Sequence, residues 1–144
     1  MSKITPVAIA IIHKENKFLL TERKGTDPDD IEFGKVWHFP GGEIEFGEEV
    51  LIALKREIKE ELQLTIEIDA QIPKIYSAIR EPYWHGILIP HVCSIVGSED
   101  IVLDEESIQY GWFTREEVQK LHILPFVKEM LNEANVIIAA SKLS

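Results

Sequence analysis

The chain has very little cysteine, since Cys93 is the only one among its 144 residues. One thiol excludes an internal disulfide and a metal site built from several thiolates, and it is typical of a reducing compartment. The sequence also lacks an apolar run long enough to cross a membrane and a convincing signal peptide near its start. We therefore expect a cytoplasmic protein with no membrane partner.

Positive charge is scarce as well: 15 lysines and arginines stand against 25 aspartates and glutamates, for a formal net charge of −10. Such a field repels polyphosphate backbones unless cations intervene, which argues against a nucleic-acid polymer as partner. With 45% hydrophobic residues, the chain has enough apolar material for one sizeable core. We expect one domain over residues 1–144 and leave its oligomeric state open, a homodimer included.

Hydrophobic patterning indicates a mixture of strands and helices. Runs typical of strands occupy residues 6–12, 17–22, 65–70, 74–79, 85–97 and 110–113, and a polar turn at 13–16 makes the first two a hairpin. Residues 24–36 read as a loop. Helices are predicted over roughly 48–62, from the Thr114 cap with Glu117 in a capping box, and from Pro125 to about Asn135. The fold class is α/β (α+β), with a mixed sheet and helices packed on it.

The helix near residues 48–62 carries both a core stripe and a cluster of carboxylates. Val50, Leu51, Leu54, Ile58 and Leu62 share one face at the helical spacing.

Glu57, Glu60 and Glu61 form one arc beside that stripe, and Glu61 falls between two core positions. Like charges at this spacing repel, and burial strengthens the repulsion. Carboxylate oxygens on a rigid element suit Mg²⁺, with Mn²⁺ as the alternative, so a bound divalent cation explains the cluster better than a solvated face does.

In these residues the chain resembles the signature of the Nudix hydrolase family, of the MutT-like kind. The matching positions, in register, are Gly42, Glu48, Arg56, Glu57, Ile58, Glu60, Glu61 and Leu64. One position departs from the signature, because Gln63 stands where the family has glycine. In the family, glycine at this position ends the helix in a left-handed conformation. The presence of Gln63 therefore affects the turn after the helix and not the carboxylates.

The resemblance implies a Nudix fold, a mixed sheet sandwiched between helices, and hydrolysis of a nucleoside diphosphate linked to a group X. It implies metal binding by Glu57, Glu60 and Glu61 together with the backbone carbonyl of Gly41, and a catalytic role for Glu57. Arg56 then orients the glutamates, while Glu48 and Gly42 support the loop and the helix.

Residues outside the signature complete the predicted site. Arg23 follows the second strand and suits a bidentate grip on substrate phosphate, with a surface salt bridge as the alternative. Trp37 is a candidate for stacking on a base, as are Tyr83 and Trp84, although each is also a packing residue. Glu106 is the best-spaced candidate for an additional catalytic carboxylate, although Asp104 and Glu105 stand close to it. The alternative interpretation of this stretch is an acidic surface loop without a catalytic role.

The first functional hypothesis is a Mg²⁺-dependent nucleoside triphosphate pyrophosphohydrolase. The enzyme alternatives are a dinucleoside polyphosphate hydrolase and an ADP-ribose or nucleotide-sugar pyrophosphatase. A nucleotide-sensing Nudix module without catalysis is the alternative of another class, and the full carboxylate set argues against it.

Overall fold

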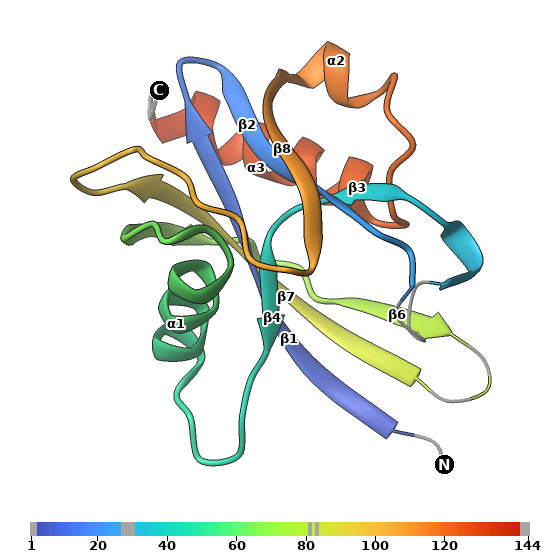
Figure 1. Cartoon of the computed structure of the whole chain (residues 1–144). Helices are drawn as coiled ribbons and strands as arrows, with labels where there is room; N and C mark the ends of the chain where they lie inside the picture. The colour runs from blue at the N-terminus through green and yellow to red at the C-terminus, as the bar shows by residue number, and fades with distance from the viewer. Residues whose placement is uncertain (1–2, 27–30, 81, 83, 142–144) are drawn as a thin grey trace.

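The computed structural model of the chain describes residues 3–26, 31–80, 82 and 84–141. An eight-stranded mixed sheet lies between two long helices, with α1 (Val50–Leu62) against one face and α3 (Val127–Ser141) against the other (Figure 1). The predicted α/β (α+β) class, with a mixed sheet between helices, is confirmed.

The remaining elements are short or belong to the sheet. The strands are β1 (Lys3–Lys14), β2 (Lys17–Arg23), β3 (Val36–His38), β4 (Gly41–Glu43), β5 (Ile66–Gln71), β6 (Tyr76–Arg80), β7 (Trp84–Ile95) and β8 (Ser107–Thr114). A 3₁₀ turn, η1 (Ile31–Phe33), and the single helical turn α2 (Arg115–Val118) complete the list of elements.

Strand β1 is the centre of the sheet. It runs parallel to β7, from Lys3 beside Trp84 to Ile12 beside Cys93, and antiparallel to β2 and β4. The predicted hairpin between β1 and β2 is confirmed, and its two turn residues, Glu15 and Asn16, have positive φ angles of 51° and 64°. Positive φ at both positions gives a turn whose twist matches that of paired strands.

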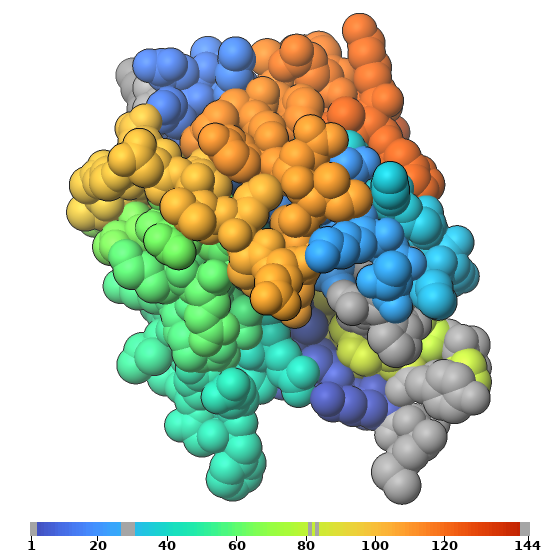
Figure 2. All heavy atoms as spheres, viewed as in Figure 1, coloured from blue at the N-terminus to red at the C-terminus, as the bar shows by residue number. Residues whose placement is uncertain are grey.

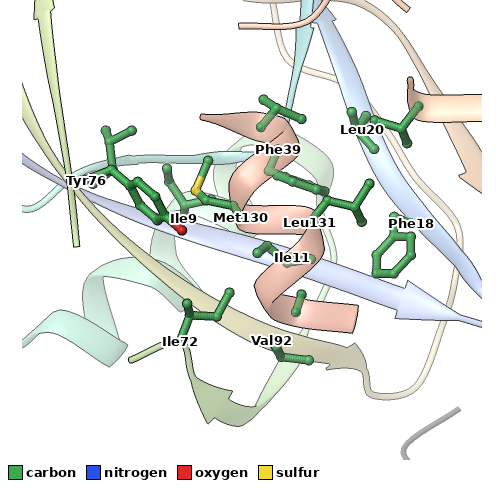
Figure 3. Close-up of a cluster of buried hydrophobic side chains, with 14 of the residues drawn as sticks. Ile9, Ile11, Phe18, Leu20, Phe39, Ile72, Tyr76, Val92, Met130 and Leu131 are labelled. Carbon is green, nitrogen blue, oxygen red and sulfur yellow. The ribbon is translucent and has the colours of Figure 1, made fainter. Parts of the chain in front are cut away.

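Side chains of β1 alternate between two cores, because successive residues of a strand point to opposite faces. Ala8, Ala10 and Ile12 pack under α1, where the two alanines leave room for the helix. Ile9 and Ile11 pack on the other face against α3, as the close-up in Figure 3 shows.

Several sequence-based boundaries were wrong. β3 and β4 were missed because their pairing partners, β2 and β1, are distant in sequence and each strand has only three residues. The helix predicted from residue 48 begins at Val50, with Glu49 as its cap, and Leu51 is 37% exposed because the first turn extends beyond the core. Residues 27–30 of the predicted loop lie outside the described part of the chain.

The last helix also differs from its prediction. It begins at Val127 and continues to Ser141, well beyond Asn135. Residues 136–140 are apolar, and Ile137 and Ile138 pack partly against the core, which extends the helix past the predicted end. Among the described residues, no helix has the length and apolar character that crossing a membrane requires.

Candidate active site

Helix α1 carries the three acidic residues Glu57, Glu60 and Glu61, which differ in burial. Leu54, Ile58 and Leu62 are fully buried beneath it, which fixes the rotation of the helix. That rotation leaves Glu60 exposed, with 57% of its side chain accessible, whereas Glu61 is only 6% exposed. The predicted position of Glu61 between core residues is confirmed.

Arg56 joins three of the signature glutamates. Its Nε donates to Glu48 Oε2 at 2.6 Å and its Nη2 to Glu48 Oε1 at 2.9 Å, a bidentate pair. Its Nη1 donates to Glu57 Oε1 at 3.0 Å and to Glu60 Oε1 at 3.1 Å. Charge-assisted bonds of this kind hold geometry firmly, so one guanidinium sets the direction of two carboxylates on α1.

Glu48 anchors the loop that leads into α1. Its Oε1 also accepts a hydrogen bond from the Glu45 backbone N–H at 3.0 Å. Hydrogen bonds from Arg56, followed by that backbone bond, lower the pKa of Glu48 to about 2. The carboxylate is therefore ionised at neutral pH and stabilises the loop through charge as well as geometry.

Burial raises the pKa of Glu57, against the opposing effect of Arg56, and the charges of Glu60 and Glu106 raise it further. Burial also raises the pKa of Glu61 well above its usual value, with added repulsion from Glu57, Asp104 and Glu106. Neighbouring negative charges disfavour ionisation in both cases. The cluster is thus electrostatically strained when it is ionised and holds no cation.

Glu106 reaches this cluster because the segment before β8 lies along the end of α1. The Asp104 N–H donates to the Glu61 carbonyl at 3.1 Å, and the Val102 N–H donates to the Leu62 carbonyl at 3.1 Å. The Glu106 N–H in turn donates to Asp104 Oδ1 at 3.1 Å, which shapes the turn. Tertiary hydrogen bonds therefore bring an acidic side chain from far along the chain beside the helix.

Two glycines of β4 allow backbone and carboxylate to approach closely. A Cβ atom on Gly42 would lie 2.2 Å from Glu57 Oε2, so a side chain there would displace the carboxylate from its present position. A Cβ atom on Gly41 would lie 2.1 Å from the Ala8 carbonyl oxygen of the paired strand β1. Gly41 is therefore required by the backbone of β1, and Gly42 allows Glu57 its present position.

A cavity of about 650 Å³ opens beside these residues. The fold brings together on this cavity six residues predicted from the sequence, namely Arg23, Gly41, Gly42, Glu57, Trp84 and Glu106. Figure 2 shows the molecular surface hollowed here, with dark blue atoms of β1 visible between the orange segment before β8 and the teal segment before α1.

Other predicted residues lie elsewhere. Arg56, Glu48, Glu60 and Glu61 surround Glu57 rather than line the cavity. Trp37 packs edge-to-face on Phe113, with ring centroids 5.0 Å apart, and is not among the described cavity-lining residues. Tyr83 lies outside the described residues.

The cavity also contains residues that the sequence alone did not single out as functional. Thr5, His38 and Arg80 come from three different strands, and no short motif connects them. Burial, and secondarily the charge of Arg23, lowers the pKa of His38 well below its usual value, so its imidazole is neutral at pH 7. The sequence alone offered no sign of their role, because only the arrangement of the three strands shows that these residues face the cavity.

The donor chemistry of the acidic cluster fits a hard divalent cation. Glu57, Glu60 and Glu61 supply carboxylate oxygens on one rigid helix, and a cation relieves the repulsion that raises two of their pKa values. Among the described residues, no group of three or more acidic, histidine or cysteine side chains is gathered closely enough to hold a metal ion, and Arg56 hydrogen-bonds both Glu57 and Glu60. The hydrogen bond from Arg56 to Glu57 uses Oε1 of that carboxylate and not Oε2.

Comparison with known proteins identifies the family. Residues 3–133 match the family model described as the NUDIX domain, and the chain belongs to this family. Nudix proteins are pyrophosphohydrolases that generally use divalent metal ions such as Mg²⁺.

Two curated relatives are similar over part of the chain. It is 37% identical over 89 residues to an ADP-ribose pyrophosphatase of Methanocaldococcus jannaschii, covering 62% of this chain and 50% of the relative. It is 40% identical over 65 residues to an 8-oxo-dGTP diphosphatase of Buchnera aphidicola, covering 44% of this chain and 46% of the relative. The chain thus spans about half the length of the curated relatives it matches.

Solved structures agree with the fold. The crystal structure of a MutT NUDIX hydrolase from Burkholderia pseudomallei aligns with a TM-score of 0.78 at 21% identity, covering 92% of this chain and 98% of that one. At this identity the likeness concerns the fold alone.

Proposed function

We propose that this chain is a Mg²⁺-dependent pyrophosphohydrolase that cleaves the diphosphate linkage of a nucleoside diphosphate bonded to a group X. The substrate class we propose first is the nucleoside triphosphates. The observation that carries the proposal is the convergence of Glu57 and Glu106 on one cavity, with buried Glu61 close enough for the charges of both to raise its pKa. A volume of about 650 Å³ lies within the range of small-molecule sites.

In this proposal the metal is held by Glu57, Glu60 and Glu61 with the carbonyl of Gly41. When bound, Mg²⁺ supplies positive charge to the phosphate oxygens and acidifies a coordinated water. Mn²⁺ suits the same oxygen ligands.

The chain's own residues position the reactants and accept the proton. Arg23 lines the cavity and grips phosphate oxygens with its planar guanidinium. As water attacks phosphorus, a new P–O bond forms, the bridging P–O bond breaks towards pyrophosphate, and a carboxylate accepts the proton of the water. Glu57 and Glu106 both line the cavity and are the two candidates for that base.

Arg56 acts through the glutamates and does not line the cavity. It holds Glu57 and Glu60 at 3.0 and 3.1 Å while anchored itself by Glu48. The bidentate pair with Glu48 fixes the guanidinium, and the guanidinium fixes the carboxylates.

An ADP-ribose or nucleotide-sugar pyrophosphatase is the second candidate, favoured by the longer of the two curated matches. A dinucleoside polyphosphate hydrolase stays an alternative within the same chemistry. A nucleotide sensor would bind without turnover, and the complete set of four signature residues, Arg56, Glu57, Glu60 and Glu61, weighs against it.

A substrate panel with Mg²⁺ tests the proposal. Nucleoside triphosphates, ADP-ribose, a nucleotide sugar and a dinucleoside tetraphosphate are incubated with the protein, and the products are separated by chromatography. We expect a monophosphate and pyrophosphate from the triphosphates and no reaction when EDTA removes the metal. Tight binding with no turnover of any compound would favour the sensor.

A further inference from the structure

The cavity has a second end, built on strands β1, β6 and β7 and separate in sequence from the acidic helix. Strand register places Thr5 beside Gly86 and Gly86 beside Ala78, in a row of small residues. Two residues further along these strands, and so on the same face of the sheet, Trp84 pairs with Arg80. All of these except Gly86 line the cavity.

Trp84 forms a flat apolar wall at this end. A Cβ atom on Gly86 would lie 2.2 Å from the Trp84 Cη2 atom. The indole therefore lies over Gly86 and occupies the space that a side chain at residue 86 would fill. Leu88 extends the apolar surface from the neighbouring position on the same strand face. A broad, flat surface of this kind matches the face of a planar ring.

The segment that leads into α3 adds apolar residues to the cavity lining. Leu124 and Pro125 line the cavity, and the Leu124 N–H donates to the Trp37 carbonyl at 3.0 Å. Val127 and Met130 of α3 line it further. The cavity therefore has apolar lining both from the sheet and from α3 with the segment before it.

Arg80 supplies the charge at this end of the cavity. Its guanidinium carbon lies 4.7 Å from the centroid of the Phe33 ring and 5.8 Å from that of Trp84. Only 10% of its side chain is exposed, and its Nε stands 4.0 Å from Glu32 Oε1. Two aromatic rings thus hold a buried cation in place at the cavity wall.

Thr5 adds a second polar group. It is 2% exposed and lines the cavity, and its hydroxyl has no hydrogen-bond partner among the described residues. A buried hydroxyl without a partner is costly, so a ligand that bonds to it gains affinity.

We propose that this end of the cavity is the base subsite, and that Arg80 makes it select bases with two adjacent hydrogen-bond acceptors, namely guanine and cytosine. The inference rests on the proposed function, because it takes the cavity as the nucleotide site. Arginine has five N–H donors and no acceptor, and it binds two neighbouring acceptors in a bidentate manner.

Guanine offers that pattern at O6 and N7, and cytosine offers it at O2 and N3. Adenine has its N6 amino group beside the acceptors N1 and N7, and uracil has its N3–H between the acceptors O2 and O4. In both bases one N–H of the arginine would therefore face an N–H of the base, which is unfavourable. Base stacking on Trp84 is common to all four bases and contributes affinity without selection.

Binding of nucleoside monophosphates tests the inference without requiring turnover. The Kd values of GMP, CMP, AMP and UMP are measured by calorimetry with the unmodified protein. A bidentate contact discriminates by roughly 5- to 150-fold, so GMP and CMP should bind tighter than AMP and UMP by a factor in that range.

Arg80→Gln provides the complementary variant, because glutamine carries both an acceptor and a donor and pairs with adenine. It should lose affinity for GMP and gain relative affinity for AMP. Arg115→Gln removes an arginine outside the cavity and should leave all four Kd values unchanged. Circular dichroism verifies that each variant is folded. If Arg80→Gln does not fold, the order of the four Kd values in the unmodified protein decides the test.

Equal Kd values for the four monophosphates, or no binding of any of them, would overturn the inference. An unchanged order in folded Arg80→Gln would do so as well. If the hydrolysis panel shows no turnover but the binding order holds, the proposed catalysis is wrong and the base subsite stands.

Discussion

The end of α1 offers a direct test of local stability, because Gln63 occupies a conformation that favours glycine. Its φ and ψ angles are 57° and 32°, and its N–H donates to the Lys59 carbonyl at 3.0 Å as the helix closes. The helix therefore ends as the resemblance implies, with glutamine in the position where the family has glycine. We expect Gln63→Gly to stabilise the protein.

The magnitude follows from two opposing contributions. A non-glycine residue in the left-handed region costs roughly 1–2 kcal/mol. Glycine loses more backbone entropy on folding, which takes back about 0.4–1 kcal/mol. The Gln63 side chain is exposed, so its removal sacrifices little packing. The net gain is about 0.5–1 kcal/mol, or a rise in Tm of about 1–4 °C for a chain of this size.

Urea unfolding and thermal unfolding, both followed by circular dichroism in metal-free buffer, measure the change. Lys55→Gly is the matched control, since Lys55 is exposed in the middle of α1, where glycine should cost about 1 kcal/mol. Asn16→Gly is a second control at a positive φ of 64°, and its gain should be smaller because asparagine tolerates this region better. A loss of stability in Gln63→Gly would mean that the helix does not end in this way in solution.

The other predictions concern the acidic cluster. Glu60→Gln and Glu61→Gln should each cut Mg²⁺-dependent turnover strongly while circular dichroism shows an intact fold, and near-normal activity in both would contradict their assignment as ligands. Because the native pKa of Glu61 lies above the usual 4.5, the native state binds this proton more tightly than the unfolded chain does. The stability of the metal-free protein should therefore fall as pH rises from 4.5 towards that raised value, and Glu61→Gln should remove this part of the loss and raise Tm at pH 7. Glu106→Gln should lower kcat by roughly 10²–10⁴-fold with little change in KM if Glu106 accepts the proton. Asp104→Asn and Glu105→Gln are its controls under saturating Mg²⁺, and an equal, small effect of all three variants would leave Glu57 as the base.

The sequence by itself determined the helix that carries the carboxylates. Its apolar spacing places Leu54 and Ile58 in the core, and the same periodicity puts Glu61 between core positions, because the helix turns by a constant angle per residue. Arg56 lies one turn from Glu60, so their hydrogen bond also follows from local geometry. Local periodicity was therefore sufficient for α1 and for the hairpin of β1 and β2.

Contacts between distant segments could be decided only by the tertiary structure. Glu106 approaches Glu61 because the Asp104 N–H pairs with the end of α1. Spacing made Glu106 the preferred candidate in the sequence, but Asp104 and Glu105 stand too close to it for spacing alone to decide. Strands β3 and β4 exist only through pairing with β2 and β1, since three residues carry too little periodicity to indicate a strand.

The second end of the cavity depends on tertiary structure in the same way. The register of β1, β7 and β6 brings Thr5, Trp84 and Arg80 to one wall, although Thr5 lies far from the other two in sequence. Periodicity within a segment tells which side of a strand or helix a residue occupies. Strand order and register, which depend on packing of the whole chain, decide which residues from different segments meet there.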